Sequence, residues 1–177
     1  VQVCDDLNDG DDANGQKATI LTDFDATILG SQDNSLYNIT YHLTQAQANN
    51  NTNALASPYY NANPFTFQIF ARIENRLKTD CFDTTEFTVN VNPIPEALDA
   101  NLIQCDEDGV NDGLTSFNLA EANDNLNGGV TNRTVKFYPS FLDAQNSLNA
   151  INASPFTNTT NPQILYAQVV DNATGCF

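Results

Sequence analysis

The second half of this chain repeats the first, and that duplication constrains the fold more than any other feature of the sequence. The segment ITYHLTQAQA at 39–48 matches VKFYPSFLDA at 135–144, each residue lying 96 positions after its counterpart. FQIFARIEN at 67–75 matches QILYAQVVD at 163–171 at the same offset. Solenoid repeats have periods of roughly 20 to 50 residues, so this period is that of a whole domain. We therefore predict two copies of one domain, at 1–95 and 96–177.

Short β-strands are predicted within each copy. YNITYHL at 37–43, FTFQIFARI at 65–73 and EFTVNVNP at 86–93 place aromatic and β-branched residues at alternate positions between turn-forming residues. LTQAQANNN at 43–51 and FLDAQNSLNAI at 141–151 predict one or two helical turns between strands. The fold class that this pattern predicts is all-β, with two tandem immunoglobulin-like antiparallel β-sandwich repeats.

A proline-rich segment, VNPIPEALDA at 91–100, separates the two copies. Proline lacks a backbone N–H and has a fixed φ, so Pro93 and Pro95 predict the end of the last strand and a short, semi-rigid linker. The second copy stops at Phe177 without a counterpart of DTTEFTVNV at 83–91. We expect the second sandwich to lack its last strand, with an open edge that could pair with another strand.

Composition excludes several classes of partner. The chain has 6 Lys plus Arg against 22 Asp plus Glu, a formal charge of -16, which argues against binding nucleic acid or an anionic membrane. There is no run of about 18 apolar residues, so we predict no membrane insertion. The chain opens at Val1 in sequence typical of a folded domain, and we expect it to be a fragment of a longer exported protein.

Each copy begins with a cysteine followed by an acidic loop, CDDLNDGDDAN at 4–14 and CDEDGVND at 105–112. No Lys or Arg lies inside either loop, and the nearest is Lys17, so internal salt bridges are not expected to neutralise them. Calcium binds six to eight oxygens, which closely spaced Asp and Asn can supply, although the EF-hand pattern is not met. The alternative is a solvated turn whose Asp and Asn side chains hydrogen-bond their own backbone. The predicted calcium ligands are Asp5, Asn8, Asp9, Asp11, Asp106, Asp108 and Asp112.

Four cysteines in an acidic chain without CxxC pairs indicate an oxidising compartment. Cys4 and Cys81 are 77 positions apart, and Cys105 and Cys176 are 71 apart, so the similar spacing predicts one disulfide within each copy. Such a loop would add roughly 4 kcal/mol in the chain-entropy model. The rival pairing joins Cys4 to Cys105 and Cys81 to Cys176, and four free thiols are a further alternative.

No catalytic constellation stands out. His42 is the only histidine, no nucleophile-elbow motif accompanies it, and its counterpart Tyr138 cannot serve as the same base at neutral pH. We expect a surface or edge-strand histidine and no enzyme. Tyr59 and Tyr60 could stack on sugar rings if exposed, or pack at a strand end.

Several segments resemble a known family: ILTDFDATILGSQDNSLYNITYHLTQAQANNNTNAL at 20–55, FARIEN at 70–75 and CFDT at 81–84. They are similar to the repeats of the giant, SprB-like surface adhesins of gliding Bacteroidetes. The resemblance implies an extracellular, tandemly repeated, non-enzymatic domain exported by the type IX secretion route. DTT at 83–85 also resembles the O-glycosylation motif of exported Bacteroidetes proteins, with Thr84 as acceptor.

The expected function is therefore a non-catalytic structural or adhesive module of a large secreted adhesin, in gliding motility or surface attachment. Its partners would be neighbouring repeats of the same chain, with surface polysaccharide or the gliding machinery as further candidates, at the outer-membrane-associated cell surface. The alternative is an accessory carbohydrate-binding module of a secreted polysaccharide-degrading enzyme.

Overall fold

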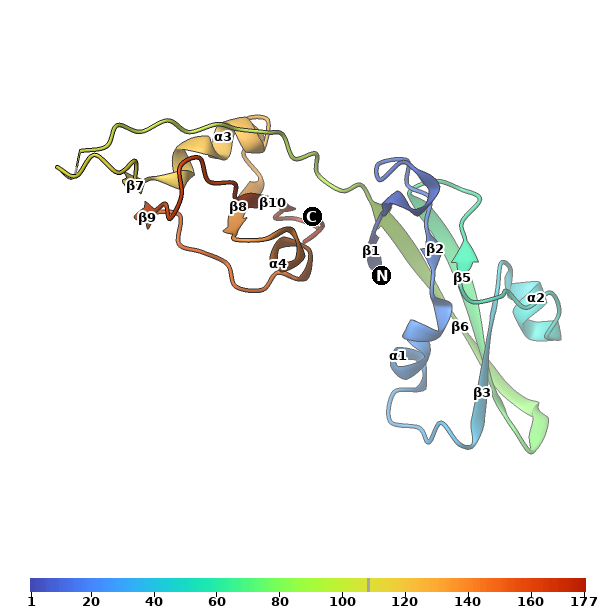
Figure 1. The fold of residues 1–177 in the computed structure, drawn as a ribbon. Coiled ribbons are helices and arrows are strands. Elements are labelled where there is room, and N and C mark those ends of the chain that lie inside the picture. Colours follow the sequence, from blue (N-terminus) through green and yellow to red (C-terminus); the bar gives the residue numbers. More distant parts are fainter. Residues whose placement is uncertain (108) are drawn as a thin grey trace. The chain divides into compact units, whose positions relative to one another are not determined.

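The computed structural model describes residues 1–107 and 109–177, and the chain divides into two compact units, Val1–Pro93 and Ile94–Phe177 (Figure 1). Each unit has its own hydrophobic core. Both units are rich in β-strands with a few short helices, so the predicted β-rich character is confirmed. Within the described ranges, no helix has the length and apolar character needed to cross a membrane.

The first unit is built on a four-stranded sheet with the order β1-β6-β5-β3. The long β5–β6 hairpin dominates this sheet, and β3 and β1 add to its two sides (Figure 1). β1 runs parallel to β6, whereas β5 is antiparallel to both β3 and β6. The strands are β1 (Gln2–Cys4), β3 (Tyr37–His42), β5 (Thr66–Asn75) and β6 (Lys78–Asn92), and a separate ribbon pairs β2 (Ala18–Thr19) with β4 (Tyr59–Tyr60). The short helices are η1 (Leu7–Asp9), η2 (Leu21–Phe24), α1 (Asp25–Leu29) and α2 (Gln45–Asn50).

Alternate residues of these strands form the core of the first unit, as their sequence pattern predicts. Ile69 of β5 and Val89 and Val91 of β6 are buried against Leu21 and Tyr41. β6 ends at Asn92, directly before Pro93, because proline has no N–H to continue the ladder.

The second unit keeps only part of this arrangement. β8 (Arg133–Tyr138) and β10 (Tyr166–Asp171) form an antiparallel pair and correspond to β3 and β5 of the first unit. A ribbon of β7 (Ser116–Phe117) and β9 (Phe156–Thr157) corresponds to β2 and β4. The helices are η3 (Leu119–Ala122), α3 (Asn123–Leu126) and α4 (Phe141–Asn146). Among the described residues of this unit no strand corresponds to β6, as the sequence predicts.

Helices α2 and α4 confirm the helical turns predicted between strands. Thr44 and Ser140 precede them, and each hydroxyl accepts a hydrogen bond from the backbone N–H three residues later, at 3.2 and 3.1 Å. Asn51 and Ser147 end the two helices in the left-handed conformation, with φ of 50° and 53°. The duplication therefore extends to the capping residues of corresponding helices.

Candidate functional site

The acidic loop of the first unit folds around the carboxylate of Asp5, which is only 2% exposed. Its Oδ2 accepts a hydrogen bond from the Gly15 N–H at 2.8 Å, and its Oδ1 accepts one from the Asp6 N–H at 2.9 Å. Asp6, Asp9 and Asp11 each accept from the N–H two residues later, at 2.9 to 3.0 Å. These are Asx turns, so the loop has the geometry of the alternative in which Asp side chains bond their own backbone.

Asn61 fastens this loop to the ribbon of β2 and β4. The side chain is fully buried; its Oδ1 accepts from the Lys17 N–H at 2.7 Å, and its Nδ2 donates to the carbonyls of Gly15 and Asn63 at 2.8 and 2.7 Å. One amide thereby satisfies three backbone groups from two distant segments. The loop and the ribbon are held in one fixed arrangement.

Lys17 forms an ion pair with the acidic loop, which the sequence did not lead us to expect. Its ammonium donates to the Cys4 carbonyl at 2.6 Å and lies 3.0 Å from a carboxylate oxygen of Asp6. Burial raises the pKa of Asp6, but the N–H of Asn8 and the Lys17 ammonium lower it more, so the net pKa lies below its usual value. The expectation that no internal salt bridge serves the loop is wrong for this carboxylate.

The second unit repeats the buried part of this network. Asp106 Oδ2 accepts from the Gly113 N–H at 2.9 Å, as Asp5 does from Gly15. The side chain of Asn158 accepts from the Thr115 N–H at 2.7 Å and donates to the carbonyls of Gly113 and Thr160 at 2.9 and 3.0 Å. An Asp and an Asn that hold the entry loop are thus common to both copies.

The two buried asparagines are residues that the sequence analysis did not single out. A signal existed, because Asn61 in SPYYNANP and Asn158 in SPFTNTTNP occupy matching places in the duplicated segments. Their structural role depends on hydrogen bonds to residues 43 to 46 positions away, and no local sequence pattern reveals these contacts.

The outer side of the first loop carries a second polar cluster around Asp9. Its carboxylate accepts from Asn14 Nδ2 at 2.9 Å and from the Tyr60 hydroxyl at 2.6 Å. These two side-chain hydrogen bonds lower the pKa of Asp9 below its usual value. The same carboxylate raises the pKa of Tyr60 to about 12, because it stabilises the protonated phenol.

The predicted calcium ligands are only partly brought together. Asn8 is exposed, the Asp9 and Asp11 oxygens take part in the hydrogen bonds above, and Asp112 Oδ1 accepts from the Leu114 N–H at 2.9 Å. Asp108 lies outside the described residues. Within residues 1–107 and 109–177, no group of three or more His, Cys, Asp or Glu side chains is arranged so that it could hold a metal ion. Calcium binding stays a prediction.

The cysteines differ from the predicted pairing. Cys81 and Cys105 are exposed free thiols, whereas Cys4 and Cys176 are disulfide-bonded. The predicted disulfides within each copy are therefore wrong, and so is the rival pairing. The register of the sheet gives the reason for the first copy: Cys4 lies opposite Asn92, eleven residues along β6 from Cys81. At about 3.3 Å per residue this is roughly 36 Å, whereas bonded cysteines have Cα atoms about 5.5 Å apart.

His42 lies on the edge strand β3, which confirms the edge-strand alternative of the prediction, and its side chain is fully buried. Its Nδ1 lies 2.9 Å from the Thr52 carbonyl oxygen and its Nε2 lies 3.0 Å from the Thr40 hydroxyl. The Nδ1 contact fastens the turn that follows α2, whereas the Nε2 contact is with a hydroxyl of β3 itself.

The remaining candidate residues lie apart from each other. Tyr59 packs against Phe67, with ring centroids 5.7 Å apart, and Tyr60 is 47% exposed. Thr84 is half-buried on β6, where its hydroxyl accepts a hydrogen bond from Gln45 Nε2 at 2.9 Å.

Comparison with known proteins identifies the repeated unit. Residues 1–95 and 101–177 each match the Flavobacterium inter-domain disulphide bond domain. No curated protein and no solved structure matches the chain. The family fits the Bacteroidetes surface-protein context of the resemblance, without specifying gliding-adhesin repeats. Because the two matches together cover nearly all of the sequence, the chain belongs to the family of Flavobacterium inter-domain disulphide bond domains and carries two copies of it.

Proposed function

We propose that this chain is a structural segment of a multi-domain surface protein whose successive domains are cross-linked by disulfides between domains. The observation that carries the proposal is the state of the four cysteines, two of them disulfide-bonded and two exposed as free thiols. The family to which both copies belong supports it, since its description names a disulfide between domains.

The proposed cross-links follow one rule. Each copy has an entry cysteine directly before its acidic loop, Cys4 or Cys105, and an exit cysteine near its last matched segment, Cys81 or Cys176. In the proposed rule, the entry cysteine of one copy bonds to the exit cysteine of the next. Within this chain the rule pairs Cys4 with Cys176 and leaves Cys81 and Cys105 for copies before and after it.

Such cross-links would act mechanically. A bond from Cys4 to Cys176 closes a loop of 172 positions, which adds about 5 kcal/mol in the chain-entropy model. It would also limit the separation of the two units that the segment around Pro93 and Pro95 joins. The buried Asp5 and Asn61 network would transmit load from Cys4 into the first unit, because it anchors the segment that follows that cysteine.

The finer proposal is an adhesive, non-catalytic repeat, exported by type IX secretion to the outer surface and acting in gliding or attachment. The resemblance of residues 20–55, 70–75 and 81–84 to gliding-adhesin repeats supports it. In fold terms we propose an immunoglobulin-like sandwich for each copy, supported by a four-stranded sheet and a two-stranded ribbon that both contribute to one core.

The carbohydrate-binding alternative has weaker support. Tyr59 is packed against Phe67 in the core and is not free to stack on a sugar ring. Tyr60 is exposed, but a single aromatic residue whose hydroxyl is bonded to Asp9 makes a small platform.

Disulfide mapping without reduction tests the proposal. The protein, expressed in an oxidising compartment, is alkylated, digested and analysed by mass spectrometry. We expect a linked pair of peptides containing Cys4 and Cys176, with Cys81 and Cys105 alkylated. Cys4→Ser should make Cys176 alkylatable, whereas the matched control Cys81→Ser should leave the linked pair unchanged. Linked peptides within one copy would refute the proposal.

A further inference from the structure

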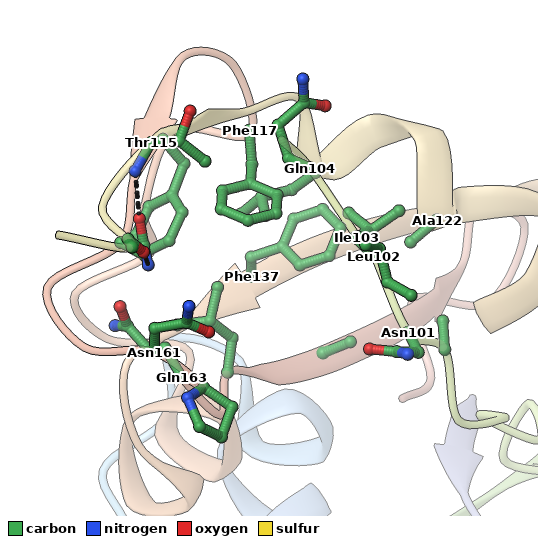
Figure 2. A pocket seen from close by; sticks show the side chains of 18 of the residues that line it. Asn101, Leu102, Ile103, Gln104, Thr115, Phe117, Ala122, Phe137, Asn161 and Gln163 are labelled. Atoms are coloured by element: carbon green, nitrogen blue, oxygen red, sulfur yellow. Dashed lines mark hydrogen bonds between the residues drawn. The ribbon is translucent and has the colours of Figure 1, made fainter. Parts of the chain in front are cut away.

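An open groove lined by both apolar and polar residues lies in the second unit, with a cavity volume of about 420 Å³. In Figure 2, Phe117 and Phe137 lie between the chain at 101–104 on one side and Asn161 and Gln163 on the other. The groove thus reaches the core residues of this unit. An opening to the core is unusual, because a folded domain normally covers such side chains.

The first unit shows what occupies the equivalent space there. β6 lies between β1 and β5, with Val91 opposite Val3 and Val89 opposite Phe67. Val89 and Val91 are 0% and 2% exposed and belong to the core. In the first copy, therefore, a strand with apolar residues at alternate positions closes this face.

The second unit has both walls of that space without the strand between them. Residues 100–104 line one side of the groove. They come directly before Cys105, and in the first copy the matching position before Cys4 belongs to β1. Gln163, Leu165 and Ala167 correspond to alternate residues of β5 and line the other side. Among the described residues, β10 pairs only with β8, so its opposite edge offers free backbone groups.

The two units differ in burial and in strand length, and both differences agree with the lack of a strand beside β10 at the place that β6 takes beside β5. Ile69 is 0% exposed and Ala71 1%, whereas their counterparts Leu165 and Ala167 are only partly buried. β5 begins at Thr66, but β10 begins at Tyr166, four residues later in the repeat. β6 pairs along the whole of β5, and the second unit forms only the part of that strand that corresponds to Phe70–Asn75.

We propose that this groove is a strand-acceptor site. Its occupant is an extended segment of the last-strand type of this domain, with one aromatic and two β-branched residues at alternate positions, as in EFTVNVN at 86–92. The segment adds antiparallel to residues 162–171: its backbone completes the sheet, and its alternate side chains fill the groove. This inference is independent of the cysteine pairing proposed above.

The test uses the full 177-residue protein and a synthetic peptide with the sequence of residues 83–93, DTTEFTVNVNP. A control peptide has the same length, with the two positions equivalent to Val89 and Val91 changed to Asp. Calorimetric titration should give saturable one-to-one binding of the first peptide. The control should bind at least about tenfold more weakly, because burying two valines accounts for at least that difference.

Hydrogen exchange locates the peptide. Saturation with the first peptide should slow exchange of the amides at 163–167 and leave β5 of the first unit unchanged. Absence of binding, equal affinity for the two peptides, or protection confined to the first unit would each overturn the proposal. Protection of 163–167 that depends on protein concentration alone, together with a dimer in sedimentation, would show that a folded second molecule covers the groove and so overturn the proposed occupant.

Discussion

Replacing Asn61 by alanine should destabilise the first unit more than most single substitutions. The amide is fully buried and makes three hydrogen bonds, of 2.7 to 2.8 Å, to the backbone of Gly15, Lys17 and Asn63. Each such bond contributes about 1 kcal/mol net, and its loss leaves a backbone group without a partner. We expect Asn61→Ala to lower the stability of the first unit by about 3 kcal/mol.

The two-unit chain calls for a measurement that resolves each unit, because a single unfolding free energy is not defined when domains unfold separately. Native-state hydrogen exchange by mass spectrometry does this. The slowest amides of β5 and β6 should exchange about a hundredfold faster in Asn61→Ala, which is the rate equivalent of that destabilisation. Amides of β8 and β10 should keep their rates.

The duplicated chain supplies its own matched variant. Asn158 makes the corresponding three hydrogen bonds in the second unit, so Asn158→Ala should accelerate exchange in β8 and β10 instead. Asn61→Asp keeps the acceptor for the Lys17 N–H, but it places a buried carboxylate oxygen against the carbonyls of Gly15 and Asn63, so it should destabilise the first unit at least as much as Asn61→Ala. The exposed Asn50→Ala serves as control. Wild-type exchange in Asn61→Ala, or equal acceleration in both units, would refute the reasoning.

Two further predictions concern the acidic loops. The Asp9 carboxylate raises the pKa of Tyr60 to about 12 from the usual 10.0, so the stability from this contact is present below pH 10 and lost as pH rises through 12. Ultraviolet absorbance of tyrosinate, followed as pH rises, should show that wild type has one more tyrosine with a raised pKa than Tyr60→Phe has. An equal number of such tyrosines in the two proteins would contradict this. Calcium binding to an acidic loop should raise the free energy of unfolding by about 2.7 kcal/mol at a hundredfold excess of free calcium over Kd. The melting temperature should then rise with calcium and fall with EDTA, and superimposed melting curves would contradict the prediction.

Local sequence determined the features that depend on periodicity and on the stereochemistry of single residues. The repeat at an offset of 96 predicted two domains, and alternation of apolar residues predicted strands such as β5. Pro93 marked the end of β6, and the segments at 43–51 and 141–151 predicted the short helices α2 and α4. These follow from the sequence because the forces that decide them act within a few residues.

The tertiary structure alone decided which distant residues meet. The register of β1 on β6 places Cys4 opposite Asn92 and far from Cys81, and no spacing of cysteines in the sequence encodes that register. The sequence predicted a surface or edge-strand position for His42; its strand does lie at an edge, but only the tertiary structure shows that the side chain is buried, with Nδ1 on the Thr52 carbonyl. Burial of a polar side chain depends on partners that the fold brings from elsewhere, as Asn61 receives them from the entry loop.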